Sequence, residues 1–249
     1  MPTLTGKTAI VTGASLGIGA AIARKLAAEG ASVAVNYARS KAQAETVVDE
    51  IRKAGGKAIA VQADLRDAAQ ITKLFDETVK AFGKVDVLVN NAGQYEFQPL
   101  AEVTEEHIDK HFDLNVKSLI LATKEAVKVF GDNGGNIINI SSIVAQGAVP
   151  NGSVYSATKA AVDSLTRSWA AELGPKKIIV NAVSPGATVT EGVQTMDPQG
   201  AMFNQFIAKT PFGRLGQPDD IANVVAFLAG SQAAWITGEA LSVSGGLRA

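Results

Sequence analysis

Short runs of β-branched and small apolar residues alternate along the chain with longer segments in which apolar positions recur every three or four residues. The short runs predict strands, and the longer segments predict helices. The predicted strands cover residues 7–12, 31–36, 57–62, 85–90, 135–141, 178–184 and 240–245. The predicted helices cover residues 18–30, 40–56, 68–83, about 104–130, 154–173 and 217–229.

Several of the predicted strands are continuous apolar runs, without alternation of apolar and polar residues. Strands of this kind are typically covered on both faces, as in a parallel sheet between two layers of helices. The alternation of strands and helices further implies right-handed crossovers and a doubly wound arrangement. We therefore expect an α/β protein with a mostly parallel, seven-stranded sheet, helices on both faces, and a single domain over residues 1–249.

One stretch, residues 186–216, interrupts this alternation and mixes glycine, proline and threonine with methionine and phenylalanine. Loops of this length in compact domains are commonly lids or binding loops. This one leaves the carboxyl end of a predicted strand, where α/β sheets bind ligands. We therefore expect a substrate lid around residues 187–212, with a plain surface excursion as the alternative.

Composition narrows the classes of function. Apolar residues of the set AVILMFWYC make up 47% of the 249 residues and charged residues 19%, which suffices for a large core. The net charge of −1 gives no indication of a nucleic-acid or acidic-membrane partner. The absence of cysteine excludes disulfides and thiolate chemistry. His107 and His111 are expected on a solvated helix face, not in a metal site.

The sequence gives no sign of export or membrane insertion. Its first residues contain no basic segment followed by an apolar stretch, as a signal peptide would. It also lacks a run of about 18 uncharged apolar residues, the length that a membrane-spanning helix needs. A soluble, cytoplasmic protein is therefore expected.

A glycine-rich turn joins the first predicted strand to the first predicted helix. Gly13, Gly17 and Gly19 in TGASLGIG follow the spacing G-x3-G-x-G. Glycine lets the backbone approach a pyrophosphate closely, and a helix N-terminus supplies free N–H groups and the positive end of a dipole. Its position between a strand and a helix makes the pattern indicative of a dinucleotide site. A simple tight turn would need fewer glycines.

Further motifs occur at regular places along the chain. They are NNAG at 90–93, LNV around Asn115, INISS at 138–142, YSATK at 155–159, SPG at 184–186 and TGEALSVSGG at 237–246. Together with the glycine spacing, they resemble the short-chain dehydrogenase/reductase family over essentially the whole chain. The resemblance implies a Rossmann-type fold and an oxidoreductase, closest in pattern to 3-oxoacyl-carrier-protein-reductase-like and glucose-dehydrogenase-like members.

Tyr155 and Lys159 lie one turn apart on a predicted helix, so their side chains face the same way. A free phenol titrates near pH ~10, and a neighbouring cation can lower that pKa by ~1–3 units. The resemblance implies that Tyr155 donates a proton to a substrate carbonyl, while Ser142 hydrogen-bonds its oxygen and Lys159 also binds the nicotinamide ribose. It implies that Asn115 anchors a water that relays protons. Ser141 is the rival of Ser142, and the spacing to Tyr155 selects Ser142.

The resemblance also implies which residues contact the dinucleotide. They are Gly13, Ser15, Leu16, Gly17, Ile18, Gly19, Asn36, Tyr37, Ala38, Arg39, Ser40, Asp64, Leu65, Asn90, Ala92, Gly93, Tyr155, Lys159, Pro185, Gly186, Thr188 and Thr190. Asp64 is expected at the adenine. A cap on the helix that follows is the alternative role for this carboxylate.

The end of the second predicted strand favours NADP(H). In dinucleotide folds an acidic residue about 20 positions past the glycines holds the adenine ribose 2′-hydroxyl and would repel a 2′-phosphate. Here Asn36 is neutral and Arg39 follows it, and a guanidinium can bind a phosphate through two parallel hydrogen bonds. Because Ser15 and Leu16 stand where many NADP-preferring relatives carry a basic residue, NAD(H) is kept as a weaker alternative.

The substrate stays open, with a small ketone or alcohol as the main hypothesis. A 3-oxoacyl-carrier-protein reductase would need basic residues for an acidic carrier; residues 130–136 contain none, although Lys176 and Lys177 supply one patch. A sugar or polyol dehydrogenase is a second alternative, since some share a similar NY after the second strand. A non-catalytic cofactor-binding regulator is a third, against which the intact catalytic set argues. The resemblance further implies a homotetramer.

Overall fold

The computed structural model of the chain describes residues 3–191 and 201–248. Within these ranges seven strands form one sheet in the order β3–β2–β1–β4–β5–β6–β7, and every neighbouring pair is parallel. The strands are β1 Thr8–Val11, β2 Ser32–Tyr37, β3 Lys57–Gln62, β4 Val87–Asn90, β5 Gly135–Ile140, β6 Ile178–Pro185 and β7 Ala240–Val243. The predicted doubly wound Rossmann-type fold is confirmed, and this sheet is parallel throughout.

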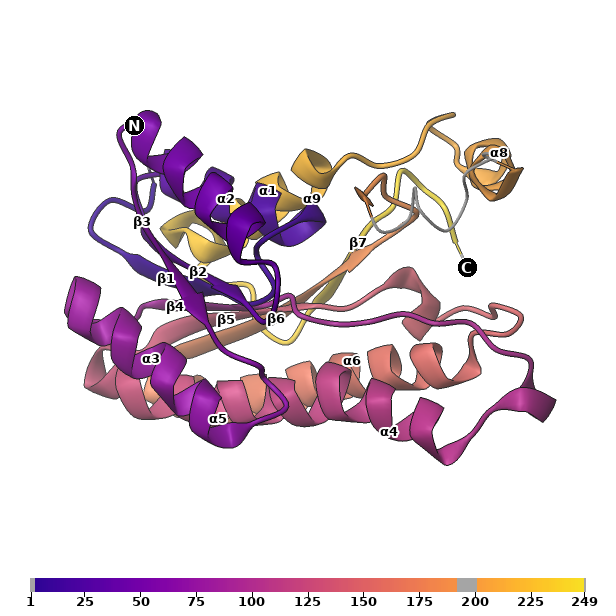
Figure 1. Cartoon of the computed structure of the whole chain (residues 1–249), viewed down its shortest axis with the longest axis horizontal. Helices are drawn as coiled ribbons and strands as arrows, with labels where there is room; N and C mark the ends of the chain where they lie inside the picture. The colour runs from indigo at the N-terminus through magenta and orange to yellow at the C-terminus, as the bar shows by residue number, and fades with distance from the viewer. Residues whose placement is uncertain (1–2, 192–200, 249) are drawn as a thin grey trace.

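Helices cover both faces of the sheet (Figure 1). Helices α1, α2 and α9 lie on one face, and α3, α5 and α6 lie on the other. The α-helices are α1 Gly17–Ala28, α2 Lys41–Lys53, α3 Ala68–Phe82, α4 Glu105–Phe112, α5 Ser118–Phe130, α6 Ser153–Leu173, α8 Ala201–Lys209 and α9 Pro218–Ala229. None of the helices within the described ranges is long and apolar enough to cross a membrane.

The continuous apolar strands are explained by two hydrophobic cores, one on each side of the sheet. In β1, Ala9 and Val11 belong to the core beneath α1 and α9, whereas Ile10 belongs to the core beneath α3 and α5. All three residues are 0% exposed. Because successive strand residues point to opposite faces, a strand covered on both sides has no polar position to alternate with.

Two predicted segments differ from the structure. The single helix expected over 104–130 is divided into α4 and α5 by a π-helical turn, Asp113–Lys117. The stretch expected to be irregular contains α8, and its residue Thr188 pairs with Gly216 in an isolated parallel bridge. The predicted lid at 187–212 includes residues 192–200, which lie outside the described residues, so the lid stays a prediction.

The strand order reverses between β1 and β4. The chain winds outward from β1 to β3 on one side and from β4 to β7 on the other. The loops that follow β1 and β4 therefore leave the sheet in opposite directions, and ligands bind at this switch point in folds of this type. The glycine-rich turn and the NNAG motif meet at this point.

Candidate active site

The glycine-rich turn after β1 is built for close contacts. Gly13 has φ +60°, and a Cβ there would come within 2.9 Å of Ala92 Cα. A Cβ on Gly19 would collide with Asn91 Nδ2 and with the carbonyl oxygen of Gly13. Gly17, at φ +56°, faces Thr190. The spacing of the three glycines is thus required by the packing of this turn on its neighbours, and it leaves the backbone exposed at the start of α1.

Two polar residues join the loop after β1 to the loop after β4. Thr12 Oγ1 donates to Val89 O at 3.2 Å and accepts from the backbone N–H groups of Asn91 and Ala92. Asn91 Nδ2 donates to the carbonyl oxygens of Thr12 at 2.9 Å and Gly13 at 3.1 Å. These bonds lock the loop after β4 to the loop after β1. Neither Thr12 nor Asn91 was singled out from the sequence, although Asn91 lies inside NNAG.

The N-terminus of α1 can receive an anion. Leu16 is the N-cap residue and makes no side-chain hydrogen bond to the helix, and the first turn holds no acidic residue. Free N–H groups and the positive end of the helix dipole attract phosphate. Ser15 and Ile18 are partly exposed beside them, and Leu16 is 42% exposed. This cradle fits a dinucleotide pyrophosphate.

The residues at the end of β2 divide into an inner and an outer group. Asn36 is 1% exposed; its Oδ1 accepts from the Gly13 N–H at 3.1 Å and its Nδ2 donates to Ala63 O at 3.1 Å. Its side chain therefore holds the glycine turn to β2 and β3 and is turned away from solvent. Tyr37 is also buried, at 6% exposure. Because both side chains are buried, Asn36 and Tyr37 shape the backbone around the predicted cofactor site and expose little side-chain surface to a cofactor.

The outer group consists of exposed Ala38 and Arg39 with Ser40, which precedes α2. Within the described residues the Arg39 guanidinium forms no ion pair, but its charge contributes to lowering the pKa of Asp64. The main cause of that lowering is Arg66, whose Nη2 lies 2.6 Å from Asp64 Oδ2. The site therefore carries a second guanidinium that sequence reasoning did not anticipate.

Asp64 does not cap the helix after β3. The N-cap of α3 is Asp67, whose side chain accepts from the Ala69 N–H at 2.8 Å. The alternative role considered for Asp64 is therefore wrong, and its carboxylate is instead engaged by Arg66. Leu65, next in sequence, is 4% exposed and belongs to the core.

The end of β4 continues into the catalytic part of the site. Asn90 is 4% exposed, and its Nδ2 donates to Asn139 Oδ1 at 2.9 Å and to Thr123 Oγ1 at 3.2 Å. Gly93 follows on the exposed side. A Cβ at Gly93 would lie 3.2 Å from Asn115 Oδ1 and 3.7 Å from Lys159 Nζ. The structure thus brings Asn115 and Lys159 together around this glycine.

Asn115 lies in the π-helical turn between α4 and α5 and is 2% exposed. Its Oδ1 accepts from the Gln94 N–H at 2.8 Å, and its Nδ2 donates to Gln94 O at 2.9 Å and to Thr158 Oγ1 at 3.0 Å. Both amide donors are therefore used within the protein. The side chain joins the loop after β4 to α6, and only an acceptor is left to hold a water.

The remaining candidates meet where β5 ends beside α6. Ser142 is partly exposed and hydrogen-bonds to the Tyr155 side chain. Ser141 is 3% exposed, and its Oγ donates to Lys159 O at 3.3 Å. The two serines thus face opposite ways, and Ser142 is the one beside Tyr155, as expected. Lys159 Nζ donates to Ile140 O at 2.8 Å and lies 5.7 Å from the centre of the Tyr155 ring.

The electrostatics of this group differ from the expectation that Lys159 lowers the pKa of Tyr155. Burial raises the pKa of Tyr155 to about 12, and the hydrogen bond with Ser142 only partly opposes this rise. Burial also lowers the pKa of Lys159 to about 8, with Asp163 opposing that shift. Desolvation therefore outweighs the attraction between phenolate and ammonium at this distance. Tyr155 keeps its proton throughout the neutral range.

The segment after β6 completes the site. The Gly186 N–H donates to Val243 O at 3.0 Å, and a Cβ on Gly186 would lie 2.8 Å from Ser244 Cβ. Thr188 Oγ1 donates to Gly186 O at 3.0 Å. Thr190 lies beside Gly17 of the glycine turn, and Pro185 is the last residue of β6. The segment therefore reaches from β6 across to the start of α1.

Comparison with known proteins agrees with this arrangement. A family model described as enoyl-(acyl carrier protein) reductase matches residues 13–248. An oxidoreductase of Methylorubrum extorquens is 55% identical over 249 residues, which cover 100% of both chains. The chain belongs to the short-chain dehydrogenase/reductase family. It is accordingly an oxidoreductase with a Rossmann-type fold.

Two solved members of the short-chain dehydrogenase/reductase family carry nicotinamide cofactors. A short-chain dehydrogenase from Burkholderia cenocepacia in complex with NADP is 39% identical, with a TM-score of 0.92 and 98% of each chain covered. A 7α-hydroxysteroid dehydrogenase complexed with NADH and 7-oxo glycochenodeoxycholic acid is 38% identical, with a TM-score of 0.94, covering 98% of this chain and 95% of the other.

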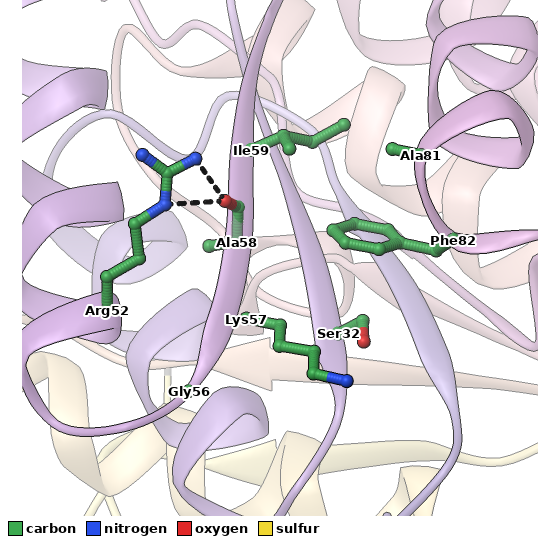
Figure 2. Close-up of a pocket in the computed structure, with 8 residues that line it drawn as sticks. All are labelled: Ser32, Arg52, Gly56, Lys57, Ala58, Ile59, Ala81 and Phe82. Carbon is green, nitrogen blue, oxygen red and sulfur yellow. Dashed lines mark hydrogen bonds between the residues drawn. The ribbon is translucent and has the colours of Figure 1, made fainter.

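A hollow of about 490 Å³ lies at the amino edge of the sheet, opposite the edge that carries the candidate catalytic and cofactor residues. Figure 2 shows it at the amino ends of β2 and β3, between α2 and α3, where Arg52 bonds to the Ala58 carbonyl oxygen. Its lining residues are Ser32, Arg52, Gly56, Lys57, Ala58, Ile59, Ala81 and Phe82. It contains none of the residues predicted for the cofactor or for catalysis.

Proposed function

We propose that the protein reduces a ketone to a secondary alcohol, reversibly, with Tyr155 as the proton donor. The observation that carries the proposal is the meeting of three side chains at the end of β5. The Tyr155 hydroxyl is hydrogen-bonded to Ser142, and the Lys159 ammonium lies beside the Tyr155 ring. A phenol, a hydroxyl and an ammonium in this arrangement can bind and protonate one carbonyl oxygen.

The roles of the three residues follow from their chemistry. Ser142 donates a hydrogen bond to the carbonyl oxygen and orients it. Tyr155 transfers its Oη proton to that oxygen, and the ammonium of Lys159 stabilises the phenolate that remains. A bound nicotinamide supplies the hydride that the carbonyl carbon gains. The raised pKa of Tyr155 favours this direction, because the phenol still holds its proton at neutral pH.

We further propose that NADP(H) is the favoured cofactor. The backbone from Gly13 to Gly19 and the start of α1 would hold the pyrophosphate, and Lys159 the nicotinamide ribose. Arg39 is exposed at the end of β2, where the adenine ribose belongs in dinucleotide folds. The Burkholderia relative holds NADP. The hydroxysteroid relative holds NADH with a 7-oxo compound, so NAD(H) is the alternative.

An activity screen tests the proposal. The purified protein is assayed with NADPH and NADH against small ketones, β-ketoesters, diketones and sugars, following cofactor absorbance. We expect oxidation of NADPH with at least one class of ketone and formation of the corresponding alcohol. Activity confined to sugar oxidation would favour the polyol dehydrogenase alternative, and cofactor binding without any turnover would favour the regulator.

A further inference from the structure

The two histidines of α4 are buried, contrary to the expectation of a solvated face. His107 is 4% exposed and His111 0%. Their ring centres lie 4.4 Å apart. Both rings pack beneath the segment 94–98, which leaves β4 and passes beside Tyr155. A solvated helix face would leave both rings in water, so these histidines belong to the support of the active site.

Both ring nitrogens of His111 are bonded to backbone groups. Nε2 faces the Glu96 N–H at 3.1 Å, and Nδ1 lies 2.8 Å from His107 O. A backbone N–H can only donate and a carbonyl can only accept. Nε2 must therefore be without a proton, and Nδ1 must carry one. These partners select a single neutral tautomer of His111.

The bond to Glu96 fixes a segment whose side chains alternate. Glu96 points towards α4, where its Oε1 lies 2.6 Å from Lys110 Nζ. Tyr95 and Phe97 point the other way, and their ring centres lie 6.2 and 6.1 Å from that of Tyr155. Alternation of this kind is expected of an extended backbone. The anchor on one side of the segment thus sets the aromatic rings on the other.

We propose that neutral His111 is a positioning residue that holds Tyr95 and Phe97 against Tyr155, and that protonation of His111 releases them. The inference rests on the proposed function, in which Tyr155 is the proton donor. A proton on Nε2 would turn it into a donor facing the Glu96 N–H, another donor, so the hydrogen bond is lost. The rings of Tyr95 and Phe97, which together form an aromatic wall beside Tyr155, then become less firmly held, while Tyr155 stays in place on α6.

Two other anchors limit the change to this wall. The backbone of Gln94 is held by Asn115, and the Gln98 N–H donates to Asn151 O at 2.8 Å. Neither bond involves an ionisable group. Loss of the His111 bond therefore frees the middle of the segment and leaves its ends tied. Substrate binding should suffer more than the proton transfer at Tyr155.

The charged surroundings keep His111 neutral near pH 7. Burial is the largest influence and lowers the pKa of His111 below its usual range, and the charges of His107 and Lys110 act in the same direction. The hydrogen bond to the His107 backbone and the charge of Glu96 oppose this lowering. Lys110 in turn lowers the pKa of Glu96, so that carboxylate stays ionised as His111 titrates. Helix α6 packs against α4 but, among the described residues, adds no charge that shifts this pKa. Release therefore requires acid below the range of a free histidine.

Nitrogen NMR of the untagged protein tests the tautomer without reference to activity. The chain contains only two histidines, and His107→Gln assigns the signals. We expect His111 to be protonated on Nδ1 at pH 7 and to titrate below the ~6.5 of a free histidine. A neutral Nε2–H form, or titration at the ordinary pH, would overturn the inference even if ketone reduction were established.

Kinetics test the positioning role. In His111→Gln, the amide oxygen can accept from Glu96 at every pH, whereas His111→Leu removes the acceptor. Wild-type KM for the ketone should rise as the pH falls below ~6.5, the value for free histidine. The Leu variant should show a KM raised roughly tenfold at every pH, the usual worth of one hydrogen bond, with a smaller change in kcat. The Gln variant should keep the low KM and lose the acid response.

Two outcomes contradict the inference. One is a Leu variant with the wild-type KM and pH profile, and the other is a Gln variant that keeps the wild-type rise in KM with acid. Asp163 also has a pKa raised by burial and lies near Lys159, so it can add its own acid response. Because the Gln variant retains Asp163, only the part of the response that disappears belongs to His111. His107→Gln is the matched control: it retains His111 and its bond to Glu96, so the rise in KM with acid should persist, at a somewhat higher pH because the charge of His107 no longer lowers the pKa of His111.

Discussion

The carboxyl edge of the sheet and its amino edge both present cations, yet those cations face different partners. At the carboxyl edge, Arg39 lies exposed beyond β2, on the edge where α1 begins. At the amino edge, Arg52 and Lys57 line the hollow of about 490 Å³ (Figure 2). There Arg52 donates two hydrogen bonds, at 3.1 and 2.9 Å, to the carbonyl oxygen of Ala58.

The polarity of the helices explains this difference. In parallel β–α units every helix starts at the carboxyl edge and ends at the amino edge, so the positive dipole ends gather at the first and the negative ends at the second. Arg52 and Lys53 occupy the last turn of α2 and complement its negative end. The helix dipoles therefore attract an anion only at the carboxyl edge. For this reason we expect the cofactor phosphates at the carboxyl edge, although the hollow of about 490 Å³ lies at the amino edge.

The largest expected effect comes from the carboxyl edge. Tyr155→Phe keeps the ring beside Tyr95 and Phe97 but removes the proton, so turnover of a ketone should fall at least ~10²-fold, the usual worth of a general acid. Binding of NADPH, followed by fluorescence titration, should be retained. Turnover near that of the wild type would remove Tyr155 from the proposed mechanism.

Neighbouring serines provide a matched pair for the same experiment. Ser142→Ala removes the hydroxyl bonded to Tyr155, whereas Ser141→Ala removes one that donates to Lys159 O. The first variant should lose turnover strongly, and the second should lose much less. Equal losses would mean that the two serines act through the packing of β5 on α6.

The next effect contrasts the two edges directly. Arg39→Ala should weaken NADPH binding by roughly ten- to a hundredfold, the equivalent of ~1.5–3 kcal/mol for a hydrogen bond to a charged group. NADH, which lacks the 2′-phosphate, should bind almost unchanged. Lys57→Ala removes the same charge at the amino edge and should alter neither cofactor.

Titration of NADPH and NADH against the two variants decides which edge of the sheet binds the 2′-phosphate. Equal losses for NADPH and NADH in Arg39→Ala would contradict a contact with the 2′-phosphate, as would a wild-type preference for NADH. The Arg39 effect should also weaken with added salt, because this side chain is exposed and salt screens exposed charges.

The smallest effect concerns substrates presented by a carrier protein. Lys176 and Lys177 precede β6 at the amino edge, where they line a hollow of about 470 Å³ together with Asp132. Residues 130–136 add no basic side chain. We expect kcat/KM for a small acetoacetyl thioester and for the carrier-bound form to differ by less than ~tenfold, about 1.4 kcal/mol. A large preference for the carrier-bound form would show that the two lysines suffice.

Much of the fold could be predicted because its signals are local. Continuous apolar strands such as β1 and glycine-terminated helices such as α3 are set by nearby residues. The division of the helix over 104–130 was missed because apolar spacing does not distinguish an α-helix from one that contains a single π-helical turn. The burial of His107 and His111 was missed for a different reason. Their cover comes from residues 94–98, which lie outside the helix.

The candidate site shows the same limit. Motif spacing was enough to bring Ser142 beside Tyr155, because both motifs lie on elements that meet at the sheet. The side chain of Asn36 could not be placed in this way. Its bonds to Gly13 and Ala63 depend on how β2 lies between two other strands. Likewise the pKa of Tyr155 depends on burial, which outweighs the pairing with Lys159 that the spacing suggested.

The π-helical turn at Asp113–Lys117 also makes the site sensitive to chain length. The Ser118 N–H reaches back to Asp113 O, five residues away, so this turn holds one residue more than an α-helical turn. The wide turn absorbs this extra residue, so removing one residue here would restore a continuous α-helix and leave the faces of α4 and α5 roughly aligned. The deletion would, however, remove the widened turn that places Asn115 against Gln94 and Thr158. This helix is therefore more vulnerable to a one-residue deletion than to most substitutions on its surface.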